Sequence, residues 1–215
     1  MAIITILFLI SALCVNTALK PFVVGSAFDE RAVQVQSCTE LPSLFARSLL
    51  LAEKPGGLIV TNSHCSIPLL PEDHEQQPLN VRLDALTESI PSYVWTDSAG
   101  VINLVPRDGI PELLKTKISE LEVDLNKTTS LAASMVTTTE DFRLAAARLG
   151  MKSGLQYGGL SSPTKPLPVK SIVFRDMTAF EILNELVRLK GKGIWLYSER
   201  ETRSSTEFTL TFLYE

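Results

Sequence analysis

The chain has 215 residues, of which 45% are hydrophobic, 20% charged and 7% aromatic. It can therefore bury a real core in one or two small domains, and a disordered or collagen-like chain is excluded. The net charge of −4 comes from 24 acidic and 20 basic side chains, which are interspersed along the chain. Binding to nucleic acid or to acidic lipid requires a cluster of Lys and Arg, which the sequence lacks, so neither nucleic acid nor acidic lipid is an expected partner.

Residues 1–18 predict a secretory signal peptide. They contain no charged side chain, and their apolar run at 3–13 is short of the roughly 20 apolar residues that span a bilayer. Small residues follow, so we expect cleavage between Cys14 and Leu19 and a periplasmic or secreted mature protein without a transmembrane segment. An uncleaved anchor and a buried strand or helix are the alternatives.

Two cysteines, Cys38 and Cys65, remain after this cleavage. An even number of cysteines in an oxidising compartment predicts a disulfide. Such a bond would restrict the unfolded chain and stabilise the fold by roughly 3 to 4 kcal/mol in the chain-entropy model. The alternative is two buried free thiols, since cysteine often serves as a small core residue.

Residues 29–124 predict an N-terminal α+β lobe. The alternation of Val and Gln at 33–38 favours a short strand, and Thr39 can cap a helix that ends at Pro55. The apolar run at 58–60 then predicts a buried strand, and the prolines within 66–78 predict a loop.

The second half of this lobe predicts a helix followed by a hairpin. The helix begins near Asn80, buries Leu83, Leu86 and Ile90 on one face, and ends at Pro91. Strands at 93–96 and 101–105 flank a turn at 97–100, and another turn follows at 106–109. Residues 118–123 fit an edge strand.

Residues 125–168 predict one helix and a linker. Thr137 followed by Glu140 resembles a capping box, which would open an Ala-rich helix at 141–149 that Gly150 closes. The segment 154–168 is rich in Gly, Ser and Pro, a composition typical of a linker between two lobes.

Residues 169–215 predict a C-terminal module of one strand, one helix and one hairpin. The strand covers 169–174, Thr178 caps the helix, and Gly191 and Gly193 end it. Strands at 194–197 and 208–213 then pair around a charged turn at 199–207. The buried stripe of the helix is predicted to comprise Phe180, Ile182, Leu183, Leu186, Val187 and Leu189.

The two predicted helix–hairpin segments superpose at an offset of 100 residues without a gap. The Leu-x-x-Leu segment at 83–86 lies over 183–186, and Trp95 lies over Trp195, the other tryptophan of the chain. We therefore predict an α+β fold with repeated strand-helix-hairpin units, whose small mixed or antiparallel sheets pack on helices. Coincidence is the alternative, since amphipathic helices share this spacing.

Three stretches of the C-terminal module together resemble a known domain. They are Phe-Arg-Asp-Met-Thr at 174–178, the leucines of the following helix, and Gly-Ile-Trp-Leu-Tyr at 193–197. The chain is similar to the short N-terminal domain of secretins and TonB-dependent receptors, well over 169–215 and partially over 79–106. The resemblance implies a periplasmic module that binds partner proteins and carries no catalytic residues.

Residues 57–65 also resemble the strand that ends in the catalytic histidine of trypsin-like serine proteases, which would make His64 a proton acceptor. An atypical or degenerate serine hydrolase using His64 is therefore the alternative function. Such an enzyme needs a nucleophilic serine in a glycine-rich oxyanion turn, and neither Ser98 nor the glycines near Gly158 supply that turn. The paired ligand spacing of structural zinc is missing around His64 and His74, so no metal or cofactor is expected.

Four aromatic residues of the two hairpins are candidate contacts for a partner: Tyr93, Trp95, Trp195 and Tyr197. Packing in the core is the alternative role for them. The favoured function is a non-catalytic protein–protein interaction module, and a carrier of a small apolar ligand is a third possibility.

The N-terminal pattern makes a direct prediction about processing. After expression in a double-membraned bacterium, the protein should be recovered in the periplasmic fraction with an N-terminus between Cys14 and Leu19, because the apolar segment directs export and cleavage. N-terminal sequencing and intact mass determine the start. A cytosolic product that retains Met1 would contradict the prediction.

Overall fold

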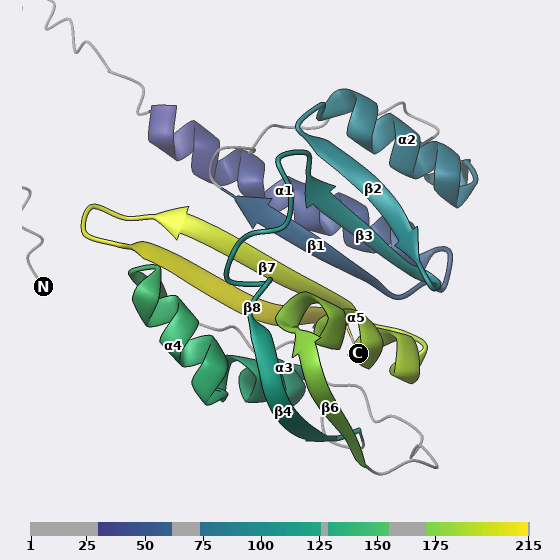
Figure 1. The fold of residues 1–215 in the computed structure, drawn as a ribbon. Helices are drawn as coiled ribbons and strands as arrows, with labels where there is room; N and C mark the ends of the chain where they lie inside the picture. The colour runs from purple at the N-terminus through teal and green to yellow at the C-terminus, as the bar shows by residue number, and fades with distance from the viewer. Residues whose placement is uncertain (1–29, 62–73, 126–128, 155–170, 215) are drawn as a thin grey trace, which may run out of the picture.

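The computed structural model describes residues 30–61, 74–125, 129–154 and 171–214 (Figure 1). Helices and strands mix in the order expected for the α+β class, which is confirmed. The elements are α1 (Glu30–Leu50), β1 (Gly56–Thr61), η2 (His74–Gln76), α2 (Leu79–Ser89), β2 (Tyr93–Ser98), β3 (Val101–Pro106), β4 (Lys117–Asp124), α3 (Thr129–Thr138), α4 (Glu140–Arg148), β5 (Met151–Ser153), β6 (Ser171–Thr178), α5 (Ala179–Lys190), β7 (Ile194–Glu201) and β8 (Thr206–Tyr214).

Six strands form one mixed sheet in the order β2-β3-β1-β7-β8-β5. The three central strands β3, β1 and β7 run parallel, and each hairpin, β2–β3 and β7–β8, contributes an antiparallel pair. The short strand β5 lies parallel to β8 at one edge of the sheet. Strands β4 and β6 pair separately as an antiparallel ribbon.

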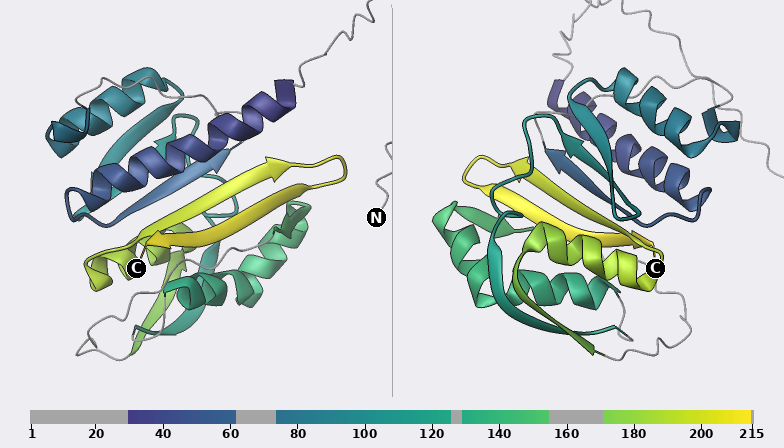
Figure 2. Two further views of the ribbon diagram at one scale, coloured as in Figure 1. Left: turned by 180° about the vertical axis from the view of Figure 1, so that it is seen from behind. Right: turned by 45° about the vertical axis from the view of Figure 1, so that its right-hand side comes forward.

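The sheet separates two hydrophobic cores (Figures 1 and 2). Helices α1 and α2 cover one face, while α3, α4, α5 and the β4–β6 ribbon lie on the other. Side chains of a strand alternate between the two cores, because successive residues point to opposite faces. In β1, Leu58 and Val60 therefore face α1 and α2, and Ile59 faces the core that contains α5.

Two glycines at the start of β1 allow close packing on both faces of the sheet. A Cβ atom on Gly56 would lie 2.3 Å from Leu49 Cδ1 of α1, and one on Gly57 would lie 2.0 Å from Trp195 Cε2. The indole of Trp195 thus lies directly over the backbone of Gly57, its partner in the β1–β7 register. The apolar run predicted this strand only from residue 58, but both glycines belong to it.

The N-terminal lobe and the C-terminal module share this sheet. Strand β1 pairs with β7 over six residues, from Gly56 opposite Ile194 to Thr61 opposite Glu199. One core also contains residues of both, including Ile59 and Val101 beside Trp195 and Phe212. The two sequence regions are therefore not separate folding units, because each supplies strands and core side chains that the other needs.

The strand predicted at 33–38 is wrong, because residues 30–50 form one continuous helix. Alternation over six residues is a weak signal, and glutamine is a good helix former. The helical spacing of Leu41, Phe45 and Leu49, all buried against the sheet, instead determines the structure of this region.

The cap of α4 lies two residues after the predicted one. Thr137 belongs to α3, a helix that the sequence analysis did not predict, and the side chain of Thr139 accepts the hydrogen bond from the Phe142 N–H. Thr137 has the glutamate three residues later that a capping box requires, whereas Thr139 has Phe142 there, so the sequence pattern favoured the wrong threonine. The Ala-rich helix and its end near Gly150, where φ is +66°, agree with the prediction.

The order of strand, helix and hairpin in the C-terminal module agrees with the sequence analysis, but the strand predicted at 169–174 is β6 at 171–178, and the burial of the helix and the turn also differ. Thr178 and Glu181 form a reciprocal capping box, and Gly191 adopts φ +67° at the end of α5. Phe180 and Leu189 are only partly buried, whereas the other four residues of the predicted stripe are buried. The strands extend to Glu201 and Thr206, so the turn comprises only residues 202–205.

Within the described ranges, the helices lack the combination of length and apolar character that crossing a bilayer requires.

Gly57 provides a test of the packing between β1 and β7. Gly57→Ala should lower the free energy of unfolding by about 3 kcal/mol, because the new methyl group overlaps the Trp195 indole. Chemical denaturation of the two proteins measures the difference. In the Trp195→Leu background the same substitution should cost much less, and equal costs in both backgrounds would contradict the contact.

The two threonines near α4 form a matched pair. Thr139→Ala should cost about 1 kcal/mol of stability, because the Phe142 N–H loses its acceptor. Thr137→Ala should be close to neutral, since Thr137 Oγ1 only donates to the Ser134 carbonyl within α3. Thermal and urea unfolding compare them, and a larger cost at Thr137 would place the cap where the sequence pattern predicted it.

Candidate functional site

The structure brings only one of the four candidate aromatic residues to the surface. Tyr93, Trp195 and Tyr197 are each 0% exposed and lie in the two cores. Trp95 is partly exposed on β2 and packs against the core beneath α2. The prediction of a four-residue binding surface is therefore corrected for the three buried residues, because a partner cannot reach side chains that fill the core.

The two indoles make matching hydrogen bonds. Trp95 Nε1 donates to Asp84 Oδ1 at 2.8 Å, and Trp195 Nε1 donates to Asn184 Oδ1 at 2.9 Å. Each acceptor lies eleven residues before its tryptophan, on the helix that precedes the hairpin. The same offset that superposes the tryptophans thus superposes their partners, and the element order α2-β2-β3 matches α5-β7-β8.

The two segments occupy unlike places in the fold. Helices α2 and α5 cover opposite faces of the sheet, so Trp95 and Trp195 point into different cores. The first hairpin places β2 at the sheet edge, whereas the second places β7 in the sheet interior beside β1. Strand β6 pairs with β4 outside this sheet, while β1 lies at its centre.

Among the strands of the described ranges, β2 lies at an edge of the sheet and pairs only with β3. A two-residue turn joins them, with positive φ at Ala99 and Gly100, so Ser98 and Val101 form the closing hydrogen-bonded pair. By the alternation of an antiparallel ladder, the backbone groups of Trp95 and Asp97 then point away from β3.

The two buried tyrosines are neutral hydrogen-bonding groups at physiological pH. Burial raises the pKa of Tyr93 above its ordinary value, although a backbone hydrogen bond with Thr61 opposes this. Burial likewise raises the pKa of Tyr197, and the adjacent Glu199 carboxylate raises it further. Tyr197 donates its hydroxyl proton to Glu199 Oε1 at 2.7 Å, which fixes this carboxylate at the end of β7.

A polar groove of about 420 Å³ lies where the parallel strands β1, β3 and β7 end. Thr61, Asp108 and Glu199 contribute to its lining from the three strands or the turns that follow them. Ligands of sheets with parallel strands often bind at this end. The described residues include no group of three His, Cys, Asp or Glu side chains arranged to hold a metal ion.

Several predicted sites fall outside the described residues. His64 and Cys65 lie in the undescribed range 62–73, and the predicted signal peptide lies within 1–29. Cys38 belongs to α1, but its side chain is not described. The disulfide, the two free thiols and the hydrolase hypothesis therefore stay predictions.

No family model matches the chain, and no curated protein or solved structure shows significant similarity to it. The functional argument therefore depends on the geometry of the described residues.

Proposed function

We propose that the protein is a periplasmic or secreted, non-catalytic interaction module that binds an extended segment of a partner protein along β2. The observation that carries this proposal is that β2 is an edge strand with a partly exposed tryptophan. Edge strands present a row of backbone donors and acceptors that a second chain can pair with.

The backbone geometry of β2 favours strand addition. The amide and carbonyl groups of Trp95 and Asp97 point to the open side of the hairpin, so an extended peptide can continue the ladder there. On the other side of the hairpin, Ile102 N–H donates to the Pro55 carbonyl at 3.1 Å. This bond directs the outer groups of β3 toward β1 and leaves β2 as the open strand of the pair.

Trp95 provides a side-chain anchor beside this edge. Its indole is held by the hydrogen bond to Asp84, so little side-chain freedom is lost when a partner covers it. Val81, 41% exposed, lies one helical turn before Asp84 on the same face of α2. Tryptophan is also enriched among the residues that dominate the energy of protein interfaces.

The resemblance to the short N-terminal domain of secretins and TonB-dependent receptors supports the same proposal. Its pattern of strand, capped helix and hairpin appears in β6, α5, β7 and β8, the first segment shares the helix and the hairpin, and the matched indole contacts are consistent with a repeated unit. Domains of that family bind partner proteins in the periplasm, which is also the compartment that the N-terminal sequence predicts.

Strand addition predicts an alternating pattern of amide protection. Peptides selected from a displayed library against residues 19–215 should slow hydrogen exchange at the Trp95 and Asp97 amides at least tenfold, because these groups gain partners in the complex. The Thr96 amide, which faces β3, should change little. NMR-detected hydrogen exchange with and without the selected peptide measures all three.

Two variants at one position serve as the matched control. Asp97→Pro removes an outward N–H and should abolish peptide binding, whereas Asp97→Asn keeps this group and an oxygen to accept from the Gly100 N–H. Equal binding by both variants, or protection away from β2, would contradict the proposal. Fluorophosphonate labelling that disappears in His64→Ala would instead favour the hydrolase.

A further inference from the structure

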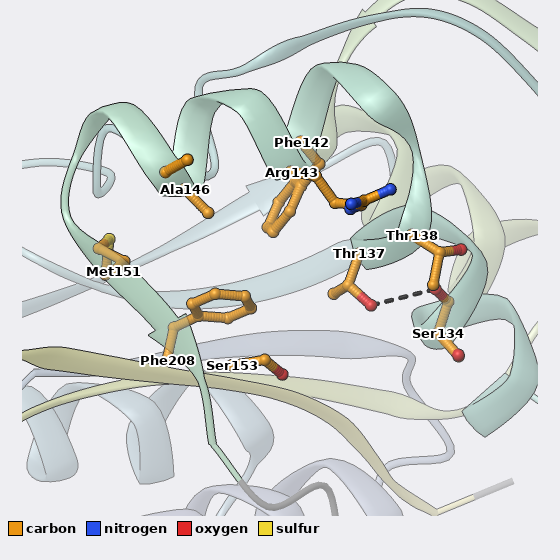
Figure 3. A pocket seen from close by; sticks show the side chains of 10 residues that line it. Ser134, Thr137, Thr138, Phe142, Arg143, Ala146, Met151, Ser153 and Phe208 are labelled. Carbon is orange, nitrogen blue, oxygen red and sulfur yellow. Dashed lines mark hydrogen bonds between the residues drawn. The ribbon is translucent and has the colours of Figure 1, made fainter.

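A cavity of about 460 Å³ lies between the α3–α4 helix pair and the strands β5 and β8 (Figure 3). Its volume falls within the range of typical small-molecule sites. Because β5 and β2 form opposite edges of the six-stranded sheet, this cavity is distinct from the proposed binding edge.

The floor of the cavity is apolar. The rings of Phe142 and Phe208 pack edge to face, with centroids 5.6 Å apart, and both residues are almost fully buried. Ala146 and Met151 extend this surface from α4 and β5 (Figure 3). The Phe142–Phe208 pair is itself closed to a ligand, so a hydrocarbon chain would cover the partly buried Met151 and the exposed Ala147, and removal of this apolar surface from water provides the driving force for binding.

The opposite side of the cavity is polar and carries one positive charge. Arg143 is the only charged side chain among the described lining residues, and it forms no ion pair with another described residue. Thr137 and Thr138 flank it from the end of α3 (Figure 3).

The hydroxyl groups of these threonines already have acceptors. Thr137 Oγ1 donates to the Ser134 carbonyl at 3.0 Å, and Thr138 Oγ1 donates to the Met135 carbonyl at 3.1 Å. Arg143 therefore provides the charged donors for a ligand, and its planar guanidinium can bind both oxygens of a carboxylate.

We propose that this cavity binds a small carboxylate with an apolar tail, such as a medium-chain fatty acid. The tail lies on Met151 and Ala147, beside the buried Phe142–Phe208 pair, and the carboxylate pairs with Arg143 at the open side. An amine with the same tail would meet the Arg143 charge and bind more weakly. An uncharged ligand would gain the apolar contacts only.

Octanoate and octanol separate the two parts of the site. Octanoate should bind the full-length mature protein about tenfold more tightly than octanol, which corresponds to about 1.4 kcal/mol from the charged group. Isothermal titration calorimetry measures both affinities, and NMR shifts of the Ala146 and Met151 methyl groups locate the ligand.

Variants on α4 provide the control. Arg143→Gln should weaken octanoate about tenfold and leave octanol unchanged, whereas Arg148→Gln, exposed and outside this cavity, should affect neither. Ala147→Leu should weaken both ligands, since Ala147 is exposed and lines the cavity. Failure of octanoate to bind, or binding that Arg143→Gln and Ala147→Leu leave unchanged, would overturn the proposal.

Discussion

The contact between the Trp195 indole and the backbone of Gly57 is the constraint on which the rest of the structure depends. The largest side chain of the core lies flat over a residue without a side chain, at the point where β7 pairs with β1. Phe180 of α5 packs edge-on against the same indole, with ring centroids 5.6 Å apart, and Asn184 accepts its N–H. One side chain thus fixes a helix, a hairpin and the strand contributed by the other half of the chain.

The same helix–hairpin contact has another consequence at β2. Trp95 also binds a polar residue of the preceding helix, but no strand among the described residues lies beyond it in the sheet, and its indole stays partly exposed. The difference between the two tryptophans follows from sheet position: β7 has neighbours on both sides, whereas β2 has one. The tryptophan–helix contact thus completes a core at Trp195, whereas at Trp95 it holds a partly exposed indole at the surface.

The two edges of the sheet suit different ligands. At β2, backbone groups and an indole favour an extended polypeptide. At the opposite edge, α3 and α4 cover β8 and leave a cavity with aromatic residues on one side and Arg143 on the other. Ladder hydrogen bonds define the first site, and apolar volume with a single charge defines the second, so occupation of one does not require occupation of the other.

The sequence by itself determined the elements whose signals are local. Helical spacing predicted α2 and α5, Thr178 predicted the start of α5, turn residues predicted the first hairpin and alternation predicted the strands of the second, since each pattern depends on neighbours a few positions away. The offset of 100 residues also superposed Asp84 on Asn184, although the hydrogen bonds they form were not foreseen.

Only the tertiary structure decided which strands became neighbours, which face each helix covered and which tryptophan reached the surface. Backbone hydrogen bonds between β1 and β7 can form between almost any two sequences, so local patterns do not specify that pairing. The cavity beside Phe142 and Arg143 likewise needs α3, β5 and β8 together, and the first two gave no recognised sequence signal. Burial and edge position depend on all neighbouring elements at once, and so they appear only when the chain is folded.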